Sequence, residues 1–166
     1  MIPRVADGLV SALSKAMFRA MDRMRHGDAF DIGTPTGTEF GGFEQTRQIL
    51  LVTFKRSGEA MPSPVNHGID GESIYVRTDA STGKMKRLRN NPHVVVVPCS
   101  FRGKPTGRSV AGIARILPEA EHAHADAVIA ANWTPVMRVF ERSLDMGSHA
   151  FGVATAYVEI TPSLAP

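Results

Sequence analysis

The sequence predicts a mainly β protein of the α+β class, with six antiparallel strands in a barrel or a sandwich and few, short helices. Three observations support this fold class. Short runs rich in β-branched residues recur from residue 49 onward, most clearly at Val94–Val97. Turn signals such as Asp70-Gly71 separate these runs. The chain has 166 residues, which is the length of a single domain that can bury a substantial core.

Residues 1–44 are expected to form an N-terminal part made of an amphipathic helix and a linker. Between residues 5 and 26, apolar residues recur at helical spacing: Val5, Leu9, Leu13, Met17, Met21 and Met24. Such a helix can pack on the domain or on a second subunit, or it can lie on a membrane surface. We expect packing, with membrane contact secondary, because the stripe holds few leucines and no aromatic residue. Residues 27–43 contain five glycines and are typical of a linker or surface loop.

Residues 45–166 are expected to form the β domain. Its strands are predicted at 49–54, 61–69, 72–78, 93–99, 109–117 and 153–160. Pro62 and Pro64 place the second strand at a sheet edge or beside a ligand. The expected helices are a short basic one that ends before Pro92, an alanine-rich one over 119–131 and one over 136–144.

The third strand leads into the most informative segment, a polar turn followed by the basic helix. The turn offers four possible helix N-caps, Thr78, Asp79, Ser81 and Thr82. Gly83 allows the backbone to approach a ligand closely. Four cations then fall within six residues, at Lys84, Lys86, Arg87 and Arg89. Free N–H groups and the positive end of the dipole at a helix start favour a phosphate there.

Other interpretations of this basic segment stay open at the level of its residues. A basic helix is often a solvated face, and it can also contact nucleic-acid phosphates. No aromatic platform accompanies the cations, so we expect no nucleic-acid partner. The spacing also differs from that of nucleotide-hydrolysing phosphate loops and of the Rossmann dinucleotide motif.

The rest of the chain offers no evident set of catalytic side chains. Cys99 lies in an apolar run and is expected to be a small core residue. His122 and His124, beside Glu119, Glu121 and Asp126, have the composition of metal ligands. Residues two apart point to opposite sides of a helix, however, so we expect an exposed polar helix and no metal. An anion site without catalytic residues suits a protein whose cofactor carries the chemistry.

Charge and hydropathy limit the partners and the compartment. The formal charge of +3 favours an anionic ligand. A single cysteine cannot form an internal disulfide. No apolar run approaches the length of a membrane span, and the first residues lack the apolar core of a signal peptide. We therefore expect a cytoplasmic protein.

Several segments in order resemble one known superfamily. They are Leu51–Gly58, Pro62–Val65, Tyr75–Asp79 and Gly83–Pro92, followed by Gly103, Gly107, Gly112–Ile116 and Tyr157–Pro162. As a set they resemble the split β-barrel flavin and deazaflavin oxidoreductases, which include the pyridoxamine-phosphate-oxidase-like proteins. The branch that depends on coenzyme F420, a deazaflavin, is the most similar. The resemblance covers roughly residues 45–162, whereas the first 40 residues depart from the short start usual in this branch.

The resemblance implies a split barrel and a homodimer with two cofactor sites at the subunit interface. It implies that Lys84 is the main cation for the cofactor phosphate, with Thr82 and Gly83 beside it. Lys86 and Arg87 would reach the phosphate or the acidic tail of a deazaflavin. The remaining implied contacts are Ser63, Pro64 and Val65 along the tricyclic ring and Thr78 near the ribityl chain.

The activity implied by the resemblance is hydride transfer between reduced F420 and a small organic acceptor. Gly83 stands where some members that use FMN have an arginine, which favours the deazaflavin. Two alternatives remain: an FMN-dependent oxidoreductase of the same fold, and a protein that binds F420 without turnover.

Overall fold

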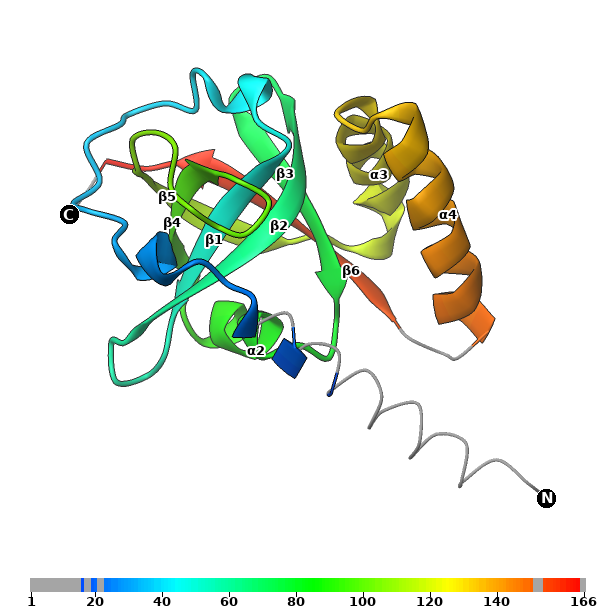
Figure 1. Cartoon of the computed structure of the whole chain (residues 1–166), viewed down its shortest axis with the longest axis horizontal. Coiled ribbons are helices and arrows are strands. Elements are labelled where there is room, and N and C mark those ends of the chain that lie inside the picture. The colour runs from blue at the N-terminus through cyan, green and yellow to red at the C-terminus, as the bar shows by residue number, and fades with distance from the viewer. Residues whose placement is uncertain (1–15, 17–18, 21–22, 151–153, 165–166) are drawn as a thin grey trace.

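The computed structural model describes residues 16, 19–20, 23–150 and 154–164. Its centre is a closed barrel with the strand order β1-β2-β3-β6-β5-β4, and all neighbours are antiparallel (Figure 1). The strands are β1 (Gln48–Phe54), β2 (Ala60–Asp70), β3 (Ser73–Asp79), β4 (His93–Cys99), β5 (Val110–Ile116) and β6 (Thr155–Pro162). The six predicted strands are confirmed, and closure of the sheet selects the barrel over the sandwich.

The hairpin between β2 and β3 forms where the sequence predicts it. Asp70 pairs with Ser73, which leaves a loop of two residues, Gly71 and Glu72. Gly71 has φ +59°, a conformation that other residues rarely adopt. The Asp70-Gly71 pair therefore sets the register of the two strands.

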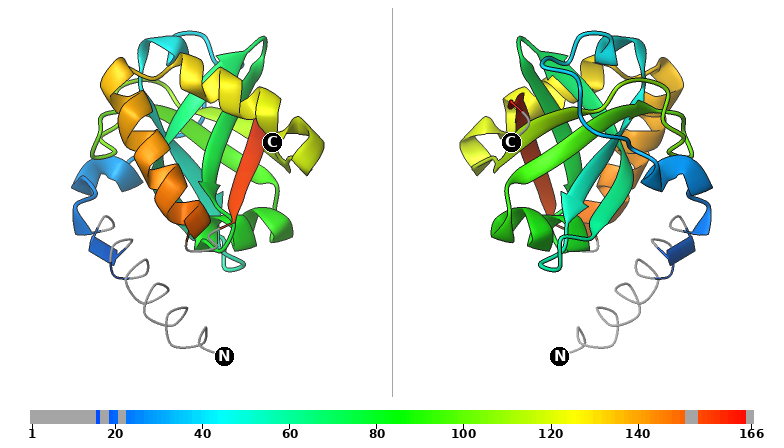
Figure 2. Two further views of the ribbon diagram at one scale, coloured as in Figure 1. Left: turned by 90° about the vertical axis from the view of Figure 1, so that its right-hand side faces the viewer. Right: turned by 90° about the vertical axis from the view of Figure 1, so that its left-hand side faces the viewer.

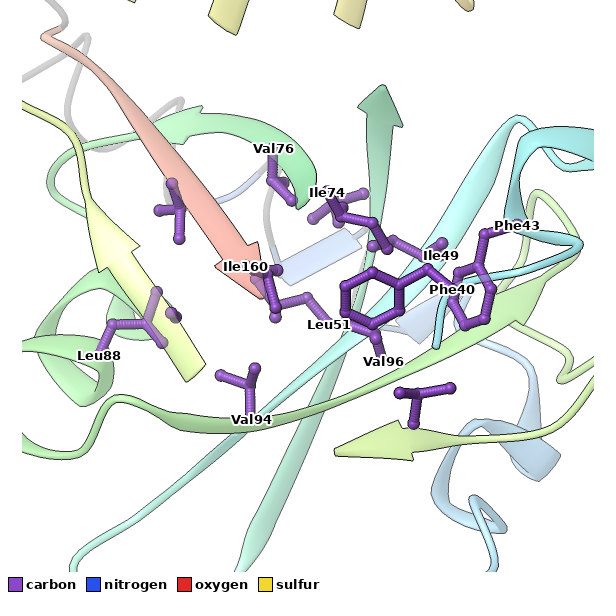
Figure 3. Packing of buried hydrophobic residues seen from close by; sticks show 14 of the residues in the cluster. Phe40, Phe43, Ile49, Leu51, Ile74, Val76, Leu88, Val94, Val96 and Ile160 are labelled. Atoms are coloured by element: carbon purple, nitrogen blue, oxygen red, sulfur yellow. The ribbon is translucent and has the colours of Figure 1, made fainter. Parts of the chain in front are cut away.

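The barrel interior is filled by the alternate side chains of its strands (Figure 3). Ile49 and Leu51 of β1 meet Val94 and Val96 of β4 there, and all four are almost fully buried. The residues between them, including Leu50 and the neighbouring valines, form a second cluster on the outer face with Ala29 and Cys99. Both faces of β1 and β4 are thus covered, which explains the unbroken apolar run in each strand.

The linker predicted over residues 27–43 contributes to the core. It contains a 3₁₀ helix, η1 (Gly27–Phe30), and leads to a second, η2 (Phe43–Gln45). Ala29, Phe40 and Phe43 are buried, and the two phenylalanine rings pack edge to face with centroids 5.5 Å apart. Sequence patterning missed this because isolated apolar residues among glycines have no periodicity.

Helices α2, α3 and α4 lie around the barrel (Figures 1 and 2). Helix α2 (Gly83–Asn90) covers one end and inserts Met85 and Leu88 into the interior cluster. Helix α3 (His122–Ala131) follows the 3₁₀ helix η3 (Glu119–Glu121) and packs on β2, β3 and β6. Helix α4 (Pro135–Ala150) lies beside α3 and is longer than predicted.

The predicted amphipathic helix over residues 5–26 falls largely outside the described residues. Its last turn is described, where the Met24 amide donates to the carbonyl of Ala20 at 3.1 Å. Among the described residues, no helix is long and apolar enough to cross a membrane.

Candidate cofactor site

The candidate site lies where β2 and β3 separate. Residues 67–70 of β2 pair with β3, but residues 60–66 pair with β1 alone. On the other side, Arg77, Thr78 and Asp79 pair only with β6. The two strands therefore separate on the N-terminal side of His67 in β2. Helix α2 crosses the barrel near their separated ends (Figure 1). Pro62 and Pro64 lie in the half of β2 with one partner strand, so the predicted edge position is confirmed.

The turn that starts α2 is fixed by its own polar groups. The Asp79 carboxylate accepts from both the backbone N–H and the hydroxyl of Ser81, each at 2.7 Å. The Thr82 hydroxyl donates to the backbone carbonyl of Asp79 at 2.8 Å. Thr82 is the N-cap residue, but its side chain makes no capping bond to the helix. Side chains of the turn thus order the chain, and the Thr82 side chain does not cap the first N–H groups of α2.

Lys84 projects from the first turn of α2 toward the end of β3. Its Nζ donates to the hydroxyl of Thr78 at 3.2 Å, and both side chains are half-buried. The first turn has no acidic residue, although helix starts usually favour one. A cation and the positive end of the helix dipole together favour an anion at this point.

Arg87 is held near the same point by the barrel. Its Nε donates to the Thr53 hydroxyl at 2.7 Å, and Thr53 is fully buried in β1. The guanidinium also lies beside the helix start, because a Cβ placed on Gly83 would be 3.0 Å from Arg87 Nη1. Glycine at position 83 therefore leaves room for this guanidinium. Thr53 was not anticipated from the sequence, although it continues the inward alternation of Ile49 and Leu51.

Three residues of β2 are predicted to contact the tricyclic ring of the cofactor: Ser63, Pro64 and Val65. They differ in burial and in the face of the strand that they occupy. Val65 belongs to the interior cluster, and Ser63 shares its face of the strand and is half-buried. Pro64 faces the opposite side, where Gly103 passes so closely that an added Cβ would be 2.9 Å from Pro64 Cγ. Of these three residues, Ser63 combines partial exposure with a hydroxyl group and a position on the unpaired half of β2.

Lys86 has an exposed side chain on α2. The structure thus brings Thr78, Gly83, Lys84 and Arg87 together at the helix start, with Thr82 fixed in the turn. Ser63 lies across the strand divergence from Thr78. Pro64 and Val65 pair instead with Leu50 and Ile49 of β1.

A shallow hollow of about 200 Å³ lies elsewhere, between residues 37–46 and 106–110. Its lining includes Glu39, Phe43 and Arg108 and none of the predicted cofactor residues. The hollow is smaller than ligand pockets of roughly 300–1,000 Å³. We therefore place the candidate site at α2 on the basis of charge and hydrogen bonding.

The other candidate residues have structural partners. Cys99 is buried, and burial raises the pKa of its thiol to about 12, so the predicted core role is confirmed. His122 Nε2 donates to the carbonyl of Leu117 at 3.1 Å, whereas His124 pairs with Asp70. Among the described residues, no three His, Cys, Asp or Glu side chains are arranged to hold a metal ion.

A polar cluster on the outer face of β3 and β6 was missed by the sequence analysis. The Tyr157 hydroxyl donates to Asp126 at 2.7 Å, and Arg77 lies 3.7 Å from the same carboxylate. Burial, followed by the Asp126 contact, raises the pKa of Tyr157 to about 12. Arg77 and Thr78 are adjacent and so point to opposite faces of β3. This cluster therefore anchors α3 and is separate from the candidate site.

Comparison with known proteins identifies the fold. No family profile and no curated protein matches the sequence. Solved structures do match, among them a protein of the pyridoxinephosphate oxidase family from Clostridium acetobutylicum that is related to general stress protein 26 of B. subtilis. It is 15% identical, with a TM-score of 0.50, over 72% of this chain and 77% of that one. The chain has the split β-barrel fold of the pyridoxamine-phosphate-oxidase-like proteins.

Two other matches show the range of proteins with this fold. A FAD-binding protein from Mesorhizobium loti is 16% identical over 73% of this chain and 82% of that one, with a TM-score of 0.50. The heme storage protein HutZ from Vibrio cholerae is 15% identical over 74% of this chain and 87% of that one, with a TM-score of 0.51. The split barrel expected from the resemblance is confirmed, and identities this low concern the fold alone.

Proposed function

We propose that this protein is an oxidoreductase that uses the deazaflavin coenzyme F420 and transfers hydride to a small organic acceptor. One observation carries the proposal: Lys84 and Arg87 converge on an uncapped helix start at the point where β2 and β3 separate. A flavin-type cofactor fits such a place, because its phosphate matches the helix start and its ring can lie along the open edge of β2.

The residues around the helix start fit the charge of a deazaflavin. Its phosphate would accept from Lys84 and from the first N–H groups of α2, with Arg87 alongside. Its acidic tail needs further cations, which exposed Lys86 and Arg89 supply on the same helix. FMN lacks that tail, so it leaves these outer cations without a role. An FMN-dependent reaction on the same fold is the second candidate.

The chain's own contribution to the reaction is binding and orientation. A bound reduced deazaflavin supplies the hydride. Thr78 is positioned by Lys84 and can contact a polar chain between the phosphate and the ring. Ser63 and the open edge of β2 would orient the ring, and the apolar strand faces nearby would exclude water.

The proposal includes a second copy of the chain. In the single chain, the half of β2 opposite Thr78 has an open edge, so the site is incomplete without further cover. A homodimer with two shared sites would provide that cover. The cytoplasmic location expected from the sequence stays a prediction.

A turnover experiment tests the proposed activity. Reduced F420 is mixed with the protein and with a quinone, an enone or a tetrapyrrole, and the return of the oxidised F420 absorbance is followed. We expect protein-dependent oxidation with one acceptor class and a much slower reaction with Lys84→Ala. Binding of F420 without oxidation by any acceptor would support a carrier protein, and binding of FMN alone would support the second candidate.

A further inference from the structure

A second surface, remote in sequence from α2, combines exposed apolar side chains with cations. Phe101 is 84% exposed, and Met24 and Phe30 are each 57% exposed. They come from two segments, residues 24–30 and residues 100–104. We call this surface the η1 face and define it by Met24, Phe30, Phe101, Arg102 and Lys104.

Specific bonds hold the two segments of the η1 face together. The His26 amide donates to the carbonyl of Arg102 at 2.7 Å. Arg102 Nε donates in return to the carbonyl of Met24 at 3.0 Å. Beneath them, Ala29 is fully buried. It lies next to Gly103, because a Cβ added to Gly103 would be 3.7 Å from the Cβ of Ala29. The exposed apolar residues therefore stand on a fixed platform.

Several large apolar side chains exposed on two segments that are bonded together indicate a binding surface. Phe30 lies under the guanidinium of Arg25, with 5.6 Å from Cζ to the ring centroid. The same two segments carry exposed basic side chains, at Arg23, Arg102 and Lys104. Over residues 19–31 and 100–104, five basic residues stand against three acidic ones. Cations beside exposed apolar side chains are complementary to an anionic surface with an apolar interior.

We propose that the η1 face docks on an anionic lipid surface. Phe30, Phe101 and Met24 would enter the boundary between headgroups and acyl chains, while the cations contact the headgroups. This inference does not depend on the proposed cofactor.

A single-stranded nucleic acid is the main competing partner, because aromatic and basic residues also bind it. The apolar set here favours lipid. Met24 and the leucines and methionines before it in sequence offer no surface for base stacking. The Nε of Arg102 already donates to the Met24 carbonyl, so Arg102 has one donor fewer for contacts with a base.

Vesicle binding by the full chain tests the proposal. The probes are vesicles of phosphatidylcholine alone and of equal parts phosphatidylcholine and phosphatidylglycerol. We expect cosedimentation with the anionic vesicles at low salt, and a large loss of binding at high salt. Lys104→Glu should lower the partition coefficient several-fold, because each basic residue near such a surface contributes roughly a fivefold factor. Phe101→Ser should lower it by a similar or larger factor.

Matched variants separate this face from general surface properties. Leu164→Ser removes an apolar side chain that is 83% exposed elsewhere, and Arg89→Glu makes the same charge change on α2. Both should bind the vesicles like the wild type. In Phe101→Trp, the emission of the new tryptophan should shift to the blue on anionic vesicles, since Trp133 is buried and contributes little change.

Three results would overturn the proposal. One is no binding of the wild type to anionic vesicles at low salt. Another is vesicle binding that the control variants reduce as much as Phe101→Ser does. The third is a result in which Phe101→Ser lowers the binding of a single-stranded oligonucleotide, or lowers self-association, but leaves vesicle binding unchanged.

Discussion

At the scale of single residues, Lys84 is the side chain on which the proposed site most depends. Its ammonium group lies at the positive end of α2, where the neighbouring first-turn residues supply no compensating carboxylate. Its bond to Thr78 holds it between the start of α2 and the end of β3. A lysine in this position, together with the positive end of the helix dipole, favours a bound phosphate.

Replacing Lys84 should therefore separate binding from stability. A charge-assisted bond to phosphate contributes on the order of 1.5–3 kcal/mol, so Lys84→Ala should weaken F420 binding roughly tenfold to a hundredfold. The melting temperature should change little. Arg89→Ala, which removes a cation from the last turn of the same helix, should weaken binding much less. Equal affinity of the wild type and Lys84→Ala would remove the phosphate assignment.

His67 gives the fold a dependence on pH. It is fully buried, and its Nε2 donates to the carbonyl of Phe43 at 3.1 Å, which ties η2 to the barrel. Burial lowers the pKa of His67 below its ordinary value of 6.5. Below about pH 6.5, His67 is therefore protonated more readily in the unfolded chain than in the folded chain. Proton binding then favours the unfolded chain, so the free energy of unfolding falls as the pH falls.

We expect the free energy of unfolding to decrease from neutral pH toward pH 5, by at most about 1.4 kcal/mol per pH unit from this residue. His67→Gln should flatten that slope, whereas His93→Gln, at an exposed position, should leave it unchanged. Urea unfolding at several pH values measures both. A slope that His67→Gln leaves intact would assign the pH dependence to other groups.

At the scale of secondary structure elements, the strands and the basic helix could be predicted because their signals are local. Alternation, the Asp70-Gly71 turn and Pro92 mark β2, β3 and the end of α2 within a few residues. The meeting of residues from different elements at the candidate site could not be predicted in the same way. Thr53 and Arg87 are 34 positions apart and meet only because α2 covers the end of the barrel next to β1.

The same limit applies to the N-terminal linker and to the position of α3. Ala29, Phe40 and Phe43 are buried because they cover parts of the barrel that its own strands leave exposed. The local sequence around these three residues has no pattern that predicts their burial. Helix α3 approaches β2 at Gly68, where an added Cβ would collide with the backbone of Val128 and Ile129. The glycine in the middle of a strand thus marks a close helix-to-strand contact.

Gly68→Ala should therefore push α3 away from β2. Backbone atoms cannot yield as a flexible side chain can, so we expect a loss of about 1–3 kcal/mol in the free energy of unfolding. The matched control is Gly27→Ala, because an added Cβ there meets no atom within 4 Å. Chemical denaturation compares the two. Equal stability of both variants would show that α3 is free to shift.

At the scale of the whole molecule, one chain leaves several surfaces uncovered. Helix α4 turns Val136, Val139 and Phe140 toward solvent, with exposed fractions of 79%, 68% and 61%. The half of β2 before His67 lacks a second partner strand. Both features are costly for an isolated chain and can be relieved by a second copy.

We accordingly expect a dimer with two-fold symmetry in solution. Sedimentation equilibrium at micromolar concentration should give twice the mass of the chain. Phe140→Asp should shift the population toward the monomer if α4 belongs to the interface, and Leu164→Asp should not. A monomeric wild type at this concentration would contradict both the dimer and the shared sites.

The central claim is that the start of α2 binds the anionic part of a deazaflavin. An equilibrium titration of the purified protein with F420, followed by a matched titration with FMN, tests it most directly. We predict saturable F420 binding at one molecule per chain, tighter than FMN and weakened by Lys84→Ala. Failure to bind F420, or F420 binding that Lys84→Ala leaves unchanged, would contradict the claim.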